Sequence, residues 1–339
     1  MDIYRTFSCM AGECPSTCCA GWNIRIDAEA MERFRSLSDG DQREDILQHI
    51  KKKRDGYYFM NRPDGSCEML DPDGLCRIQR RSREEMLCIT CRKFPRLAGK
   101  TGEDYRMSMA ASCPVVAEYL WKGKIGWYVT AEGKSYPLKE SEIPIPEENR
   151  RLLDQSLYQK YQLVKKEEPS VRNQILCLWD IYQKMYEITD GCIELLAASP
   201  ELSYLEGSFD YFEKSRENTE ILEDIIEFKK QCGGHLQKFA GGYIRYRIYS
   251  RYLEFPKESS TQNLYHVLGE LFVAFILRFS RNRITKRNDI ETAVAEINWM
   301  YRLCAHAECR EQKFEELLRN IFINIDDLSE IIIRSFSDN

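Results

Sequence analysis

The chain has 339 residues, of which 43% are hydrophobic and 12% aromatic, so it is long enough and apolar enough to bury a core. Charged residues make up 30%, the net charge is -5, and the longest apolar stretch, Leu271 to Leu277, is far shorter than the roughly 20 residues that cross a bilayer. Composition therefore excludes a disordered chain and predicts no membrane span and no nucleic-acid partner. No apolar segment precedes Cys9, so we expect no secretory signal and a cytoplasmic location.

Cysteine is concentrated near the amino terminus, where nine of the fourteen cysteines occur. In a reducing compartment, clustered thiols more often hold a metal ion or an iron–sulfur cluster than form disulfides. Thiolates are soft ligands, which favour zinc or an iron–sulfur cluster. Nine thiols exceed the four that one such site requires, so either there are two sites or several thiols bind nothing. The candidate ligands are Cys9, Cys14, Cys18, Cys19, Cys67, Cys76, Cys88, Cys91 and Cys113.

The segment that carries these cysteines is rich in turn-forming dipeptides and has few long regular elements. An amphipathic run over 28–54 is interrupted by a polar break, which predicts two short helices. Further on, an Asp-Gly-x-Cys unit ends at Cys67 and recurs at Cys76. An Asp-Gly pair favours a tight turn with glycine at positive φ, after which backbone N–H groups can point at the sulfur. The two turns are therefore predicted to present two ligands.

A helix is predicted next, because Ser82 and Glu85 form a capping-box pattern and Pro95 limits how far the helix can run. Cys88 and Cys91 lie three residues apart, so this helix would place both thiols on one face. A Cys-x-x-Cys pair is also typical of redox proteins, but a thioredoxin-like protein would need a βαβ context that the sequence lacks.

Three regions are predicted from the change in pattern along the chain. Residues 1–125 form the cysteine-rich metal- or cluster-binding region, and 126–146 form a short hairpin and a Pro-rich connector. Residues 147–339 show helical periodicity, for example over 264–275 and 289–306, and form a helical domain. The expected fold class is mainly α. No Gly-x-Gly-x-x-Gly follows a strand, so no Rossmann-type methyltransferase domain is predicted.

Several cysteine motifs follow one another in a fixed order over about the first 120 residues. They are Phe7-Ser-Cys9-x4-Cys14-x3-Cys18-Cys19-x-Gly21-Trp22, Cys67-x8-Cys76-Arg-Ile-Gln, Cys91-Arg-Lys-Phe-Pro95-Arg96 and Met109-x2-Ser112-Cys113-Pro114. This series resembles the flagellin lysine N-methylase family. Gly242-Tyr243-Ile244-x-Tyr246 and the segment from Arg302 to His306 also resemble parts of that family's helical half.

The resemblance implies methyl transfer from S-adenosylmethionine to the ε-amino groups of flagellin lysines in the bacterial cytoplasm. It also implies an iron–sulfur cluster held by the cysteine region, of the 4Fe-4S type, with zinc as the alternative. Arg92 and Arg96 belong to a matched motif and are candidates for binding the cofactor. Amine methylation needs a neutral lysine and a proton acceptor, and Tyr243 and Tyr246 are candidates for this catalytic role.

Two other function classes stay open on the sequence alone. The chain could be a non-catalytic zinc- or iron-binding scaffold whose helical half binds a flagellar or other protein partner. It could also be an electron-transfer protein, although electron transfer does not require so large a helical half. Binding of S-adenosylmethionine separates the enzyme from the scaffold.

Overall fold

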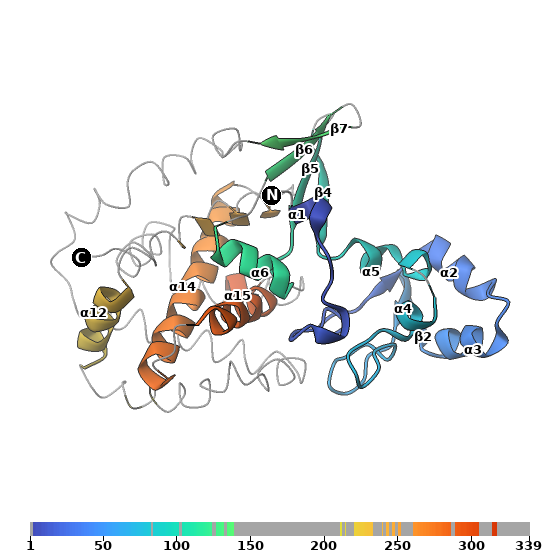
Figure 1. The fold of residues 1–339 in the computed structure, drawn as a ribbon, viewed down its shortest axis with the longest axis horizontal. Helices are drawn as coiled ribbons and strands as arrows, with labels where there is room; N and C mark the ends of the chain where they lie inside the picture. Colours follow the sequence, from blue (N-terminus) through green and yellow to red (C-terminus); the bar gives the residue numbers. More distant parts are fainter. Residues whose placement is uncertain are drawn as a thin grey trace.

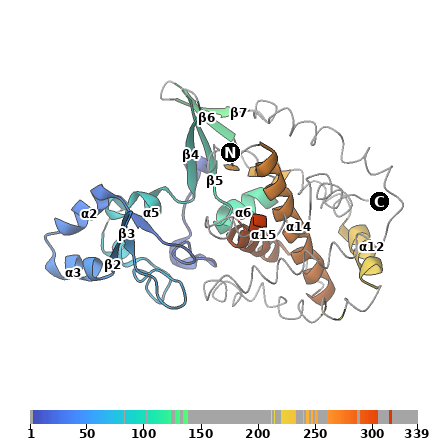
Figure 2. The same ribbon diagram turned by 180° about the vertical axis from the view of Figure 1, so that it is seen from behind.

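The computed structural model describes the cysteine-rich part of the chain almost completely and the helical part in pieces. The described residues are 3–82, 84–101, 104–123, 127–131, 134–138, 211, 214, 220–232, 239, 242–243, 246–247, 250–251, 260–285, 289–304 and 314–316. The fold is mainly α, as predicted, with two small antiparallel sheets in the described part. Figures 1 and 2 show an amino-terminal lobe beside a helical body, with the second sheet standing above their junction.

The amino-terminal lobe begins with two short helical turns, α1 (Ile3–Thr6) and η1 (Ala11–Glu13). A three-stranded sheet follows, in the order β1-β3-β2, from β1 (Arg25–Ile26), β2 (Ile50–Lys53) and β3 (Gly56–Phe59). Both neighbouring pairs in this sheet are antiparallel, with Ile26 opposite Tyr57 and Ile50 opposite Phe59.

The two short helices predicted between 28 and 54 are confirmed as α2 (Ala28–Arg35) and α3 (Gly40–Gln48), while the end of that run forms β2. Each helix starts at an aspartate whose side chain accepts a hydrogen bond from a backbone N–H of the first turn, Asp27 from Ala30 and Asp39 from Gln42. Their apolar faces contribute to a buried core with the sheet: Ala30, Met31, Phe34, Ile46 and Phe59.

The two Asp-Gly turns are confirmed. Gly65 has φ of 75° and Gly74 has φ of 79°, a left-handed conformation that other residues adopt at a cost. The Asp64 side chain accepts a hydrogen bond from the Ser66 N–H at 2.8 Å, and Asp73 accepts one from the Leu75 N–H at 3.3 Å. These bonds fix each turn directly before its cysteine.

The capping-box helix predicted from Ser82 is wrong. Ser82 instead follows the last residue of α4 (Arg77–Arg81), and its hydroxyl accepts a hydrogen bond from Gln42 Nε2 at 2.6 Å. A 3₁₀ turn, η2 (Glu84–Met86), and then α5 (Ile89–Lys93) cover the stretch that the pattern assigned to one helix. The α5 helix begins after Cys88 because Asp27, already the cap of α2, also accepts a hydrogen bond from the Ile89 N–H at 2.6 Å.

A four-stranded antiparallel sheet joins the two lobes, in the order β4-β5-β6-β7. Its strands are β4 (Arg96–Thr101), β5 (Asp104–Met109), β6 (Trp127–Ala131) and β7 (Lys134–Leu138). The hairpin predicted around Trp127 to Tyr136 is therefore confirmed, and it also pairs with β5, which the sequence did not indicate. The Pro-rich connector around Pro144 and Pro146 lies outside the described residues.

The helical body contains α6 (Pro114–Trp121), α12 (Glu220–Cys232), α14 (Ser260–Thr285) and α15 (Ile290–Cys304). The predicted helical run over 264–275 is confirmed by α14, and the run over 289–306 is confirmed by α15 as far as Cys304, after which the chain lies outside the described residues. Because α6 packs on α15 and α15 packs on α14, the chain that leaves the cysteine-rich lobe is built directly into this body. The centre of the body is fully buried at Leu271, Phe275 and Trp299.

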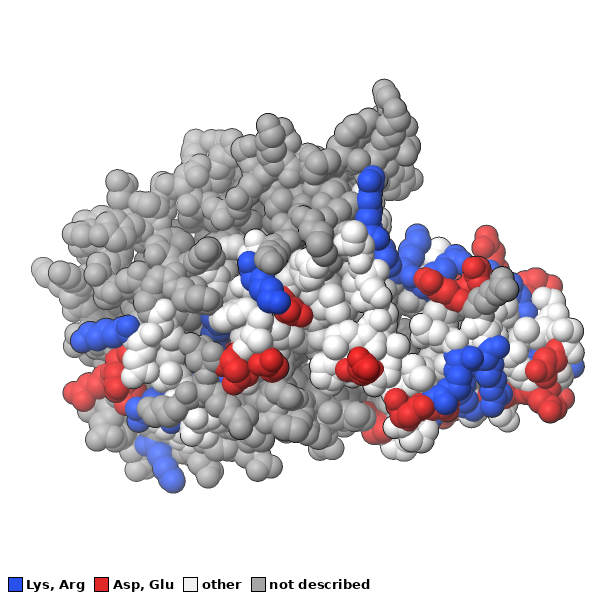
Figure 3. All heavy atoms as spheres, viewed as in Figure 1, with Lys and Arg blue, Asp and Glu red and all other residues white. Residues whose placement is uncertain are grey.

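Two properties of the described residues bear on partners. None of their helices combines the length and apolar character needed to cross a bilayer. On the face in Figure 3, basic and acidic side chains are interspersed over the amino-terminal lobe. Within this lobe Arg77 and Arg81 both pair with Asp45, at 2.5 and 3.2 Å.

Candidate metal centre

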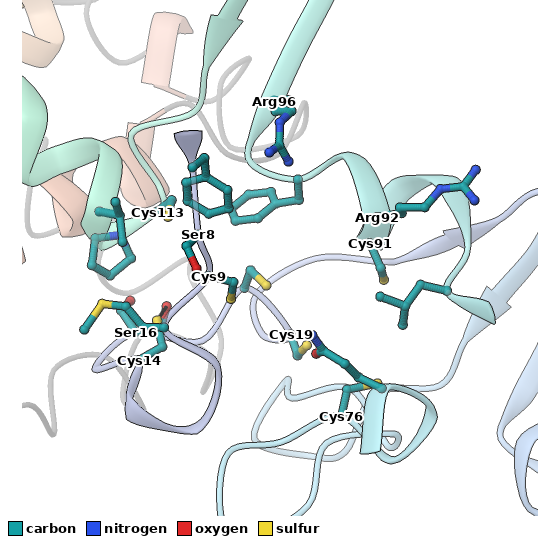
Figure 4. A pocket seen from close by; sticks show the side chains of 18 of the residues that line it. Ser8, Cys9, Cys14, Ser16, Cys19, Cys76, Cys91, Arg92, Arg96 and Cys113 are labelled. Carbon is teal, nitrogen blue, oxygen red and sulfur yellow. Dashed lines mark hydrogen bonds between the residues drawn. The ribbon is translucent and has the colours of Figure 1, made fainter. Parts of the chain in front are cut away.

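Seven of the nine candidate thiols line one cavity of about 300 Å³, whose wall is formed by residues of the amino-terminal lobe together with the first turn of α6. In Figure 4, Cys9 and Cys19 lie between Cys113 on one side and Cys91 on the other, and Cys76 approaches from below. The remaining lining is largely apolar and includes Phe7, Trp22 and Phe94. The lining thiols are those of Cys9, Cys14, Cys18, Cys19, Cys76, Cys91 and Cys113.

Three cysteines occupy equivalent local positions, because each is the residue that caps the start of a helix. Cys76 caps α4, Cys88 caps α5 and Cys113 caps α6. Backbone N–H groups of the following turn act on each sulfur and oppose the rise in pKa that burial causes, although burial still raises the pKa of Cys76 and Cys113. The positive end of a helix dipole favours a thiolate there. This arrangement suits cysteines that bind a cation as thiolates.

The amino-terminal segment contributes four more thiols, those of Cys9, Cys14, Cys18 and Cys19, and it contains a strained residue. Ala11, between Cys9 and Cys14, has φ of 51°, which costs a residue with a Cβ roughly 1–2 kcal/mol. The Ala11 N–H donates a hydrogen bond to the Cys9 sulfur at 3.3 Å. Backbone strain of this kind is often found at functional sites.

Two candidate thiols are not part of the cavity lining, namely those of Cys67 and Cys88. Both are buried, with exposed fractions of 3% and 0%, and both belong to the core of the amino-terminal lobe. Cys88 nevertheless lies behind a lining residue, since its Sγ atom is 3.5 Å from the Sγ atom of Cys91. The pair does not share a helical face as predicted, because Cys88 precedes α5 and Cys91 lies in its first turn. The two sulfurs are nevertheless close together.

Burial dominates the electrostatics of most of these thiols. It raises the pKa of Cys113 to about 12 and that of Cys67 to about 12, and it raises the pKa of Cys14 and Cys76 as well. A buried thiol resists ionisation unless a positive charge offsets the loss of solvation. A bound metal ion supplies such a charge.

The pKa of the Cys18 thiol, in contrast, is lowered. A hydrogen bond from Cys19 lowers its pKa to about 7, against the effect of burial and with help from the positive charge of Arg302. The same hydrogen bond and burial raise the pKa of Cys19 well above its ordinary value. Cys18 is therefore a thiol that ionises readily at neutral pH.

The spacing of the sulfurs bears on the kind of group that fits. Among the described residues, no three Cys, His, Asp or Glu side chains lie close enough together to hold a single metal ion. A zinc ion bound at about 2.3 Å from each sulfur would need four thiolates in close contact. The donor set is nevertheless chemically suited to a soft metal, because the Cys, His, Asp and Glu side chains of the lining are all cysteines except Glu84.

The two arginines predicted to bind a cofactor both line the cavity, in different ways. Arg96 Nε donates a hydrogen bond to the Tyr4 carbonyl at 3.0 Å, and its guanidinium lies 5.2 Å from the centre of the Phe7 ring. Arg96 thus holds the amino-terminal segment against β4. The Arg92 side chain extends away from the labelled sulfurs in Figure 4. Cofactor binding by Arg92 and Arg96 stays a prediction.

Tyr243 and Tyr246 are buried in the helical body and do not line the cavity. The Tyr243 hydroxyl donates to Glu270 Oε2 at 2.9 Å, and burial, reinforced by that carboxylate, raises the Tyr243 pKa well above its ordinary value. Glu270 is also bound by Arg247 at 2.7 and 2.8 Å. Both tyrosines therefore have a structural role, and their catalytic role stays a prediction.

Two side chains of α15 beside the cavity were not assigned a role from the sequence. Asn298 and Arg302 donate hydrogen bonds to the backbone carbonyls of the two residues that precede Cys113. Arg302 stands in a segment that resembles the flagellin lysine N-methylase family, but no spacing rule connects it with cysteines about 190 to 290 residues earlier. Only tertiary packing brings them together.

The fold and the site define a mainly α protein with a cysteine-lined cavity between two lobes. The flagellar biosynthetic protein FliU of Salmonella muenchen is 31% identical over 115 residues, which cover 32% of this chain and 68% of FliU. Lysine-N-methylases of Salmonella typhimurium and Salmonella choleraesuis are each 32% identical over 115 residues, which cover 32% of this chain. The chain belongs to the family of FliU and these lysine-N-methylases.

The matched stretch covers only 29% of the length of either lysine-N-methylase. No protein-family model matches the chain. No solved structure matches it either. The family relationship therefore rests on the shared stretch of about a third of the chain.

Proposed function

We propose that this protein is an S-adenosylmethionine-dependent protein lysine N-methyltransferase that acts on flagellin in the bacterial cytoplasm. In this proposal the cysteine-lined cavity holds an iron–sulfur cluster of the 4Fe-4S type. The observation that carries the proposal is the convergence of seven thiols on one cavity in a chain related to lysine-N-methylases. The name of FliU supports a flagellar substrate.

The donor chemistry of the cavity supports the cluster. A cluster ligated by four thiolates would draw them from the seven lining cysteines, and its positive iron ions would compensate the burial that otherwise keeps most of these thiols protonated. The helix-cap positions of Cys76 and Cys113 direct backbone N–H groups at the sulfurs, as suits buried thiolate ligands.

Lysine methylation sets requirements that the rest of the chain would have to meet. The substrate amine must lose its proton before it displaces the sulfonium methyl group, because an ammonium has no free electron pair. Lysine has an ordinary pKa of about 10.4, so the site has to lower that pKa or accept the proton. Holding the amine in line with the methyl group contributes much of the rate.

The proposal is tested with protein purified without oxygen and flagellin produced in cells that lack any flagellin methylase. Incubation with S-adenosylmethionine carrying an isotope-labelled methyl group is expected to add the label to flagellin lysines, as peptide mass spectrometry would show. A reaction without this protein is the control. Unlabelled flagellin together with absence of S-adenosylmethionine binding in calorimetry would overturn the methyltransferase proposal.

A non-catalytic metal-binding scaffold is the second candidate, and one observation favours it. The similarity to the lysine-N-methylases covers 29% of their length, so the shared stretch need not include the part that transfers methyl groups. The scaffold predicts co-purification of flagellin with the metal-loaded protein and no heat on titration with S-adenosylmethionine. Methyl transfer in the labelled assay would exclude it.

A further inference from the structure

Three buried side chains of the helical body bind the short backbone segment that leads into Cys113. The Tyr246 hydroxyl donates to the Met109 carbonyl at 2.6 Å and accepts from the Ala111 N–H at 2.9 Å. Asn298 Nδ2 donates to the Ala111 carbonyl at 3.2 Å. Arg302 donates to the Ser112 carbonyl from Nε at 3.3 Å and from Nη2 at 3.1 Å. The three side chains are at most 2% exposed, so these bonds form away from water.

Helix α15, which carries Asn298 and Arg302, also binds the amino-terminal segment that carries Cys14 and Cys18. The Ser16 hydroxyl donates to Asn298 Oδ1 at 2.6 Å, and Arg302 Nη2 donates to the Ser16 carbonyl at 3.0 Å. The Cys14 thiol donates to that same carbonyl at 3.3 Å. Asn298 and Arg302 are four residues apart and thus lie on one face of α15.

Arg302 therefore joins two segments that are far apart in the sequence, and each segment carries thiols of the cavity. Ser16 lies between Cys14 and Cys18, and Ser112 directly precedes Cys113. The guanidinium is a rigid, planar donor with several N–H groups in fixed directions. A single side chain can thus fix the relative positions of the two carbonyls, and with them the separation of the thiols beside them.

We propose that Arg302 and Asn298 are positioning residues of the thiol centre, which hold Cys14, Cys18 and Cys113 at the separation that the bound metal group requires. This inference rests on the proposed function, because it assigns these residues to the metal centre proposed there. Groups that orient metal ligands without touching the metal change metal affinity by about 10- to 100-fold when they are removed. The helical body would then control how firmly the cysteine-rich lobe retains its metal.

The experiment compares Arg302→Gln with Arg302→Lys and with Arg251→Gln. Arg251 is a matched control, because it is a fully buried arginine that pairs with Glu315 at 3.5 Å and does not line the cavity. Iron-loaded proteins are mixed with a strong iron chelator without oxygen, and the loss of iron is followed by absorption. Arg302→Gln is expected to lose iron about 10-fold faster than the wild type or more, and Arg302→Lys less so. Arg251→Gln is expected to lose iron at the wild-type rate even where its melting temperature falls.

A second measurement, made on metal-free protein, tests whether Arg302 positions the thiols even when no metal is bound. Alkylation by iodoacetamide is followed at each cysteine by mass spectrometry, with the buried Cys67 as the internal reference. Arg302→Gln is expected to raise the alkylation rates of Cys14 and Cys113 relative to that of Cys67. Asn298→Ala, which leaves Arg302 in place, is expected to act in the same direction and serves if Arg302→Gln does not fold.

Equal rates of iron loss and of alkylation in Arg302→Gln and Arg251→Gln would overturn the inference, since Arg302 would then only stabilise the fold. A wild-type protein that takes up no iron would instead overturn the proposed metal centre. In that case the selective alkylation of Cys14 and Cys113 alone would decide whether α15 positions these thiols.

Discussion

The Sγ atoms of Cys88 and Cys91 lie 3.5 Å apart, with Cys91 on the cavity wall and Cys88 in the core behind it. A hydrogen bond from Cys91 lowers the pKa of Cys88, against the effect of burial. The pair is therefore arranged for thiol–disulfide exchange whenever Cys91 is not bound to a metal.

We expect oxidised glutathione to convert this pair to a disulfide in the metal-free protein. Cys91, which lines the cavity, attacks glutathione disulfide as its thiolate and releases one glutathione, and Cys88 behind it then displaces the other glutathione. Peptide mapping without reduction would show the Cys88–Cys91 link, while Cys67 stays a thiol. Metal loading should prevent the reaction. Stable glutathione adducts at other cysteines with no Cys88–Cys91 link would contradict this prediction.

Cavity-lining cysteines should differ from core cysteines in their effect on metal content. Cys76→Ser and Cys91→Ser are expected to lower bound iron or zinc and to destabilise the amino-terminal lobe, because a small turn-rich lobe depends on its metal for stability. Cys67→Ser places a hydroxyl in the core and should lower stability without lowering the metal content of the folded fraction. Elemental analysis of the folded protein tests the contrast. Equal metal content in all three variants would exclude Cys76 and Cys91 as ligands.

The turn before Cys76 depends on a glycine conformation. Gly74 has φ of 79°, and a Cβ atom there would meet only the Gly12 backbone at an ordinary contact distance of 3.6 Å. Gly74→Ala should therefore cost about 1 kcal/mol through backbone strain alone. Gly242→Ala is the control with the opposite sign. Among the described residues no atom lies within 4 Å of a Cβ placed at this helical glycine, so alanine should stabilise the helix by up to about 1 kcal/mol. Urea denaturation measures both, and a loss of stability in both variants would contradict the argument.

Glu270 should make the stability of the helical body depend on pH. Burial alone would raise its pKa, but the Arg247 charge and hydrogen bonds outweigh burial, so the pKa lies well below the ordinary value of 4.5. The ion pair thus stabilises the fold above about pH 4.5, and that contribution is lost as pH falls further toward the folded-state pKa. Glu270→Gln should cost about 3 kcal/mol at neutral pH because it leaves Arg247 buried without its partner.

Urea denaturation at neutral pH and at about pH 3 checks this prediction. The difference in unfolding free energy between wild type and Glu270→Gln should be smaller at the lower pH. A difference that stays constant would mean that the carboxylate of Glu270 does not ionise in the folded state as the geometry indicates.

Local patterns in the sequence predicted much of the fold. The Asp-Gly turns, the two helices over 28–54, the hairpin at Trp127 and the helices α14 and α15 are all confirmed, because each depends on neighbouring residues. The helix expected from Ser82 failed because Asp27, distant in the sequence, caps the later helix at Ile89. A long-range hydrogen bond there outweighs a local capping pattern.

The site was predictable in its chemistry and only partly in its geometry. Clustering of cysteines and their spacing indicated a common site, and seven of the nine candidates do line one cavity. The helix-cap position of Cys113 could have been inferred from the Pro114 that follows it, since proline is favoured in the first turn of a helix. The contact of Arg302 with Ser16 could not have been inferred, because nothing in a linear sequence relates residues 286 positions apart.

The most direct test of this account is the metal content of wild-type protein purified without oxygen, measured together with its visible spectrum. We expect iron and acid-labile sulfide in equal amounts and a broad visible absorption that disappears in Cys76→Ser and Cys91→Ser. Colourless, folded protein that binds neither iron nor sulfide after reconstitution would contradict the claim that the seven cavity thiols of this chain hold a cluster.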